Sequence, residues 1–380
     1  MSSYVTKIGS FSGYWVPLAC FCLIFPPLPL GLRTAELSLL ALCGLALAVV
    51  NGSVGTRKLR IVGWFLLLNC FGTALNVLRG EPFSLFQYFR GVTFCLIGLW
   101  LAIEKIDDRF LAVFDRMISV LTLGGLFSAF LYFAFGLDYY NSQLDIPFEL
   151  LGDKRIYVYP SLLFLVLFID AVLSARMTQI IYLVLIVVTV SKTLFFVVTL
   201  TYLLNIMANR SLKRTVFSII MLFLAAGLAA VAQLPDRIGA FVEEGDPWRM
   251  IEPLAALERL ADPLRLAIGN GAGVPYWGGR ESVMDYDEVQ RVVENSFYDV
   301  HNGFLTVLLR FGLIGGIFYV YLFSKSIPRS NFSELAAFSI AVFVNIFLSH
   351  GPIQTVEVLG LVLGLRLVQY RRRLDQRSRP

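Results

Sequence analysis

Long apolar stretches joined by polar links dominate the pattern of this 380-residue chain. A helix of about 17 to 25 apolar residues is long enough to cross the hydrocarbon core of a bilayer, and tilted neighbours accommodate somewhat different lengths. The pattern therefore predicts an all-α polytopic membrane protein with about twelve transmembrane helices and a single transmembrane domain over 1–380. The predicted spans are 14–31, 35–50, 59–78, 87–103, 112–136, 157–173, 178–191, 193–208, 215–233, 304–323, 333–349 and 354–370.

Composition agrees with this pattern. The chain is 57% hydrophobic and 16% charged, with a mean hydropathy of +0.72, which lies outside the balance of an ordinary soluble domain. The five cysteines fall within apolar runs at no metal-ligand spacing, so we expect small core residues. The first apolar run has no small-residue cleavage site and is interpreted as a retained span.

Basic residues indicate the orientation of the spans. They are concentrated in the links on one side, as in Arg57, Lys58 and Arg60, and in the last residues of the chain. Cytoplasmic links carry the excess of lysine and arginine in membrane proteins. We therefore expect both termini to be cytoplasmic.

Two segments on the outer side are too long for simple connectors, a smaller loop at 137–156 and a large loop at 234–300. The large loop holds six arginines, no lysine and thirteen acidic residues, a net charge of −7 in a chain whose total is +5. Apolar residues recur at helical spacing over 248–260, and the glycine-rich stretch 269–273 then predicts a turn. We expect this loop, between the ninth and tenth spans, to be folded and to contain a helix at or above the membrane surface.

A histidine opens the span after the large loop, in "VHNGFLTVLLRFGLIGG" over 300–316. On a continuous helix His301, Leu305, Leu308 and Gly312 would share one stripe, which predicts close packing at Gly312 below the imidazole. The helix dipole disfavours an imidazolium at this end, so His301 is expected to be neutral and able to act as a general base. The alternative is that this histidine only hydrogen-bonds a loop carbonyl or lies among lipid headgroups.

Four stretches of the chain resemble the motifs of one known protein family. "HNGFLTVLLRFGLIGG" resembles the signature of the O-antigen polymerase and ligase superfamily of bacterial envelopes, in which a histidine opens the span after the largest periplasmic loop. "WRMIEPLAALERLADPLRLAIGNGAG" is similar to the loop motif of that family, and "GDKRIYVYP" to its arginine motif in the smaller loop. "TVSKTLFF" resembles its Ser-Arg-Thr-like span junction, with Lys192 in place of arginine.

The resemblance implies a GT-C-like glycosyltransferase of the bacterial inner membrane that acts on a glycan carried by undecaprenyl diphosphate. Arginine forks match phosphate oxygens, so Arg155 and Arg249 are the predicted diphosphate ligands, with Arg90 and Lys192 as further candidates. His301 would take the proton of the attacking sugar hydroxyl. Direct displacement of the lipid diphosphate would invert the anomeric centre.

Each assignment has a structural alternative. Arg155 could anchor its span at the interface, Arg249 could pair with a nearby carboxylate, and Arg90 could reach water at the end of its span. Arg310 lies at lipid depth and needs a partner or a wet cavity, for which Asp170 is one candidate. The second histidine, in a short outer link, is interpreted as structural.

An Asp-x-Asp motif at 285–287 has the form by which many glycosyltransferases hold a metal. Such a short motif arises easily by chance in an acidic loop, and the family that this chain resembles works without metal. We therefore expect neither a metal nor an organic cofactor.

The predicted activity is polymerisation of O-antigen or related repeat units at the periplasmic face. The alternative within the superfamily is a ligase that passes the glycan to lipid A-core, and the alternative from another class is a lipid-linked oligosaccharide transporter. A transporter should show symmetry between its halves and polar groups near mid-membrane, whereas this chain gathers its arginines and its histidine on one face and its halves are unlike. The expected partners are the lipid-linked donor, an acceptor glycan or lipid A-core, membrane lipid and a chain-length regulator; nucleic acid is not expected.

Overall fold

The computed structural model is helical, apart from one pair of two-residue strands in the part of the chain that it describes. The described residues are 56–85, 87–89, 92, 115–127, 161–188, 192–208, 211–231, 247–278, 296–297, 300, 302–328, 332–347 and 356–377. They belong to two compact units, each with its own packing.

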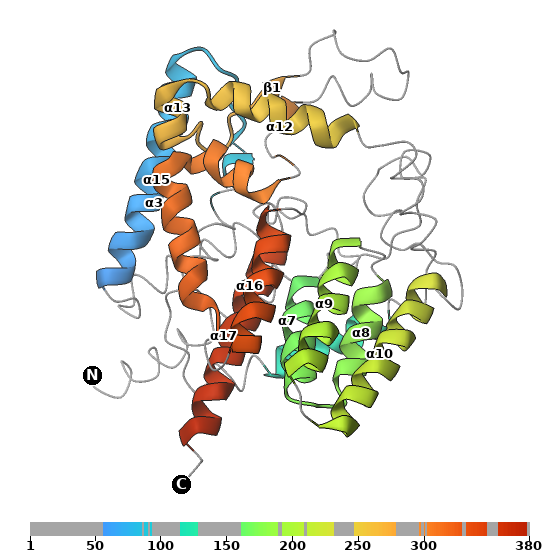
Figure 1. The fold of residues 1–380 in the computed structure, drawn as a ribbon. Coiled ribbons are helices and arrows are strands. Elements are labelled where there is room, and N and C mark those ends of the chain that lie inside the picture. Colours follow the sequence, from blue (N-terminus) through green and yellow to red (C-terminus); the bar gives the residue numbers. More distant parts are fainter. Residues whose placement is uncertain are drawn as a thin grey trace, which may run out of the picture. The chain divides into compact units, whose positions relative to one another are not determined.

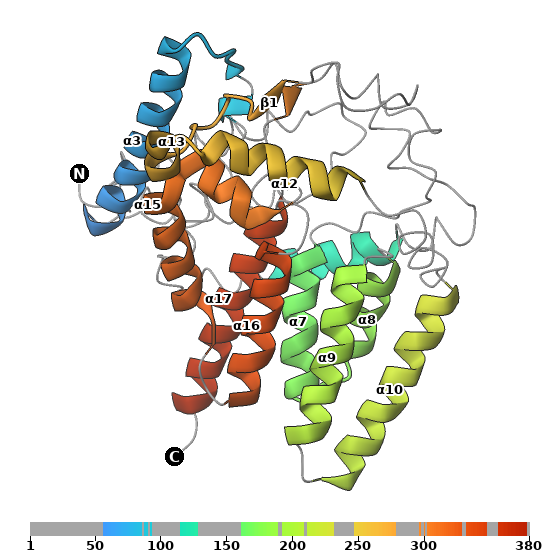
Figure 2. The ribbon, with the colours of Figure 1, turned by 45° about the horizontal axis from the view of Figure 1, so that its top comes forward.

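The first unit contains the helices around the large loop. They are α3 (Thr56–Leu78), α12 (Pro247–Leu260), α13 (Pro263–Ile268) and α15 (Gly303–Ser326), the last of which leaves the unit at its final residue. Strand β1 (Trp277–Gly278) pairs antiparallel with β2 (Ser296–Phe297), with Trp277 opposite Phe297. Figures 1 and 2 both show α12 running across α15 rather than along it.

The second unit is a group of apolar helices. It contains α7 (Ser161–Leu173), α8 (Gln179–Val188), α9 (Lys192–Ala208), α10 (Leu212–Val231), and most of α16 (Phe332–Phe347) and of α17 (Val356–Arg377). Figure 2 shows α7 to α10 as roughly aligned neighbours. Every residue of α7 from Leu162 to Val172 is buried, and all of them except Asp170 are apolar, as expected for a helix that is surrounded by other helices.

The helices agree with the apolar stretches predicted from the sequence. A described helix overlaps each of the expected spans 59–78, 157–173, 178–191, 193–208, 215–233, 304–323, 333–349 and 354–370. Within the described residues, Arg60–Leu78 and Gly303–Ser326 are long and apolar enough to cross a membrane by length and composition. Shorter apolar helices lie at Ser161–Leu173, Thr193–Ala208 and Glu334–Val344.

The helix predicted over 248–260 in the large loop is confirmed as α12, and the turn predicted at 269–273 follows α13. The expectation that the cysteines lie in a core is wrong for Cys70, which is exposed on α3. The other four cysteines lie outside the described residues.

Candidate functional site

A glycine-rich turn joins the large loop to two helices of the first unit. Gly269 ends α13 with a φ of 83°, and a Cβ there would meet the main chain of Arg310 and Phe311 in α15. Facing it, Gly312 has a φ of 64°, and a Cβ there would meet the main chain of Ala267 and Ile268. Since both glycines have left-handed φ values and direct backbone contact, no larger residue fits at either position without strain.

The turn also supplies hydrogen bonds to α15. Gly312 is non-helical, so α15 consists of two helical segments joined at a kink. The carbonyls of Leu309 and Arg310, just before the kink, accept the N–H groups of Asn270 at 2.5 Å and Gly271 at 3.2 Å. A kink disturbs the bonding of the carbonyls in the preceding turn, and here the loop provides donors to them.

A polar stripe on α3 holds the other side of this turn. Asn69, Thr73 and Asn76 are spaced three and four residues apart, so they share one face of the helix, and all three are buried. The Asn69 side chain accepts the N–H of Ala272 at 2.7 Å, and Thr73 Oγ1 donates to the carbonyl of Ala272 at 3.0 Å. Asn76 Nδ2 donates to the carbonyl of Asn270 at 3.1 Å. This stripe was readable in the sequence, as three polar residues at helical spacing within an apolar span, but sequence reasoning missed it.

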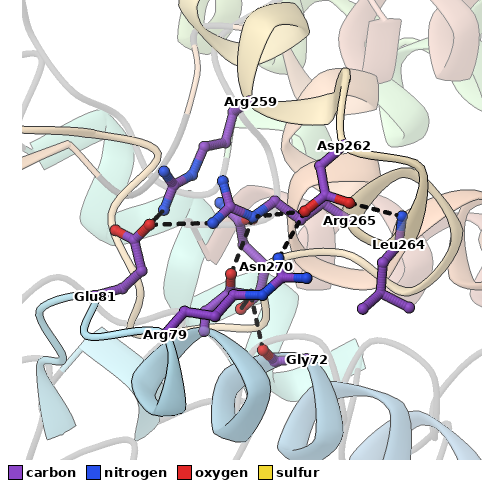
Figure 3. A network of polar contacts seen from close by, with 9 residues as sticks. Gly72, Arg79, Glu81, Arg259, Asp262, Leu264, Arg265 and Asn270 are labelled. Atoms are coloured by element: carbon purple, nitrogen blue, oxygen red, sulfur yellow. Dashed lines mark hydrogen bonds and ion pairs between the residues drawn. The ribbon is translucent and has the colours of Figure 1, made fainter.

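Just beyond the end of α3, a network of charges ties the loop down (Figure 3). Glu81 Oε1 lies 2.6 Å from Arg259 Nη2 and 3.1 Å from Arg265 Nη2, so two guanidinium groups share one carboxylate oxygen. Arg79 Nη1 lies 2.6 Å from Asp262 Oδ2, and the other oxygen of Asp262 caps α13 through the N–H of Leu264 at 2.9 Å. The network therefore connects the end of α3 to α12 and α13.

The network changes the acidity of its members. The hydrogen bond from Arg259 holds the pKa of Glu81 below its ordinary value, with a further contribution from Arg265. The hydrogen bond from Arg79 lowers the pKa of Asp262 in the same way, helped by the Leu264 N–H. Burial and the neighbouring Arg259 lower the pKa of Arg265, which shows that two guanidinium groups are held close together here.

Helix α12 packs on the beginning of α15. Ala256 and Leu260 of α12 share a buried cluster with Tyr276, Val300, Leu308 and Leu309. On a regular helix Arg249 has the same register as Ala256 and Leu260, which lie seven and eleven residues further on. Pro253 has no N–H for the carbonyl of Arg249, four residues earlier.

The first turn of α15 is fixed by side-chain hydrogen bonds. Asn302 Oδ1 accepts the N–H of Leu305 at 3.0 Å, as an N-cap residue does. Thr306 Oγ1 lies 3.1 Å from the nitrogen of Val300, 3.0 Å from its carbonyl oxygen and 3.1 Å from the carbonyl oxygen of Asn302. The residues on both sides of position 301 are therefore anchored.

Of the predicted site residues, Arg249 lies in the first turn of α12 and Lys192 is the first residue of α9. They belong to different units. His301, Arg90 and Arg155 lie outside the described residues, as does the Asp-x-Asp motif at 285–287. Among the residues described, no group of three or more histidine, cysteine or acidic side chains could hold a metal ion.

The structure differs from the expected helical stripe through His301 and Gly312. The helix begins at Gly303, after the Asn302 cap, so His301 precedes it. Gly312 stands at the kink and packs against the end of α13, so a continuous helix from 301 to 312 is not formed. The sequence argument assumed a straight helix, and the positive φ of Gly312 removes that assumption.

Asp170, considered as a partner for Arg310, instead belongs to a buried cluster in the second unit. Its carboxylate lies 2.9 Å from Arg372 and 3.1 Å from Arg176. Arg372 also lies 3.1 Å from Glu334, so the cluster joins α7, α16 and α17.

Comparison of the chain with models of known families, with characterised proteins and with solved structures finds no match.

Proposed function

We propose that this protein is a glycosyltransferase of the bacterial inner membrane that polymerises glycan repeat units carried on undecaprenyl diphosphate. It has about twelve spans, cytoplasmic termini and a periplasmic active site. His301 is the general base toward the acceptor hydroxyl, and Arg249 and Arg155 bind the donor diphosphate, with Arg90 and Lys192 as further phosphate ligands. The reaction is inverting and needs no metal.

One observation carries the proposal, the packing of α12 on the beginning of α15. Ala256 and Leu260 contact the cluster that contains Val300, the residue before His301. Arg249 shares their register and stands about 10 Å along the helix from Ala256. Arg249 therefore lies on a helix that packs against Val300, which supports pairing a cation for the leaving diphosphate with a base for the attacking hydroxyl.

The junction supports this proposal by its rigidity. A base and a phosphate ligand on different elements work together only if the elements keep a fixed geometry. The backbone contacts of Gly269 with α15, and the ion pairs of Glu81 with Arg259 and Arg265, fix the loop to the helix that follows His301.

The test is a transfer assay with purified full-length protein and one substrate, the lipid-linked repeat unit. We expect a ladder of longer glycans that remain attached to undecaprenyl diphosphate, also in the presence of a chelator. His301→Ala should abolish the ladder while the protein stays folded, because the base is lost and residue 301 precedes the helix.

Each of the other outcomes of this assay would support a different function. No ladder, but transfer of preformed glycan after lipid A-core is added, would make the protein a ligase. Failure of both reactions in a folded preparation would favour the transporter. Reversible loss of activity in chelator would assign a metal to Asp285 and Asp287 instead.

A further inference from the structure

Thr306 makes contacts that an ordinary helical threonine does not make. It lies in the first turns of α15 and is fully buried. A threonine hydroxyl in a helix commonly donates to the carbonyl four residues earlier, which for Thr306 is that of Asn302. Thr306 Oγ1 also contacts both the N–H and the carbonyl of Val300, six residues earlier and outside the helix. These two additional contacts are not part of the hydrogen bonding of the helix itself.

The Thr306 hydroxyl contacts the main chain of Val300 and of Asn302. It accepts the N–H of Val300 and has a single proton to donate, to the carbonyl of Val300 or to that of Asn302. Val300 is itself held by its apolar cluster, and the N–H of Thr306 donates to the carbonyl of Asn302 at 3.0 Å. One side chain thus contacts the main chain of Val300 and the carbonyl of Asn302, the residues before and after position 301.

We propose that Thr306 is a positioning residue for His301, because it holds the main chain of Val300 and Asn302, on the two sides of that residue, in one geometry. The proposal rests on the proposed function. A base displaced by about 1 Å can lose roughly a hundredfold in rate, so fixing its main chain has a direct effect on turnover.

A matched pair of variants tests the proposal. Thr306→Val keeps the shape and β-branching of the side chain and removes the hydroxyl, whereas Thr306→Ser keeps the hydroxyl. Thr201→Val is the control, because Thr201 is also buried in a helix and its hydroxyl donates only the ordinary bond to the carbonyl four residues earlier, that of Val197, at 2.7 Å. Should Thr306→Val not fold, Thr306→Cys carries the same test, since a thiol is a weak donor and acceptor.

The first measurement is turnover of the lipid-linked repeat unit by the full chain. We expect Thr306→Val to lower kcat by at least about tenfold with little change in KM, because geometry at the base is lost while substrate binding remains. Thr306→Ser should recover most of kcat, and Thr201→Val should match the wild type.

The second measurement does not depend on activity. The chain has two histidines, His301 and His350, so histidine-selective isotope labelling gives two imidazole signals, which His350→Gln assigns. We expect the His301 signal and its titration midpoint to move in Thr306→Val and to stay in place in Thr201→Val, with His350 unchanged in both.

The two measurements separate the possible failures. If the His301 signal does not move in Thr306→Val, the inference is overturned whatever the activity. If the signal moves and kcat is unchanged, Thr306 has no part in the transfer. If the wild type forms no glycan product while the signal moves, the proposed function fails and the positioning of His301 by Thr306 stands.

Discussion

Two regions of this protein are held together in different ways. Around the 269–273 turn, the contacts are main-chain hydrogen bonds, buried amide side chains and glycines in direct backbone contact. Around α7, eleven consecutive residues are buried, and most of them are aliphatic or aromatic. Apolar packing tolerates changes of shape, whereas a backbone junction does not, because main-chain atoms cannot adopt another rotamer.

The comparison is tested most strongly by adding one methyl group in each region. Gly312→Ala should destabilise the first unit by about 4 kcal/mol or more, because its positive φ and its contact with the main chain of α13 both exclude a Cβ. Gly227→Ala, in α10 of the second unit, meets open space and should be neutral or up to about 1 kcal/mol stabilising. Thermal unfolding in detergent micelles measures both.

Equal stability of these two alanine variants would show that the junction accepts a Cβ as easily as an open helix surface does. The contrast drawn here would then be wrong.

A smaller effect is expected at Asp170, the charged residue within the apolar helix α7. Asp170→Asn should cost about 3 kcal/mol, since it leaves two arginines without the carboxylate that is buried between them. Arg176→Gln, whose side chain is 41% exposed, should cost much less. Unfolding in micelles gives both values, and a harmless Asp170→Asn would mean that α7, α16 and α17 are held by apolar packing alone.

The smallest effect concerns the charges beside the junction. Because the pKa of Glu81 is lowered in the folded protein, its ion pairs stabilise the fold above the ordinary value of 4.5, and this stability is lost as the pH falls through the lower folded pKa. Glu81→Gln should cost up to about 1 kcal/mol at neutral pH. The difference in melting temperature from the wild type should shrink as the pH falls below 4.5.

Glu258→Gln is the control for this charge effect, because Glu258 is exposed on the neighbouring helix α12. It should stay within about 0.5 kcal/mol of the wild type. A constant difference between Glu81→Gln and the wild type at all pH values would assign the effect to packing rather than charge.

The helices could be predicted from the sequence, because an apolar stretch of given length and a spacing of three and four residues are local properties. Helix α12 and the turn after α13 were predictable for the same reason. The place where that turn docks was not, because its partners in α3 lie 194 to 203 residues earlier in the chain.

The candidate site was predictable only in part. A conspicuous histidine and arginines near predicted spans are visible in a sequence, but the residues that fix the main chain at the two ends of the first segment of α15 are ordinary ones, Thr306 and Gly312. The role of Gly312 depends on a φ of 64°, which the sequence does not reveal. The pairing of Glu81 with Arg259 and Arg265 depends on the fold, since many other charges are available in the same loop.

The polar stripe on α3 has a consequence for the time course of synthesis. At about 5 to 20 residues per second, the ribosome needs roughly 10 to 40 seconds to make the chain between α3 and the turn that binds it. During this interval Asn69, Thr73 and Asn76 belong to an emerging hydrophobic helix whose partners do not yet exist. Under the proposed membrane topology, the nascent chain has to keep this face of α3 in contact with water or with the insertion machinery until the turn arrives, which makes biogenesis, as well as stability, sensitive to these three residues.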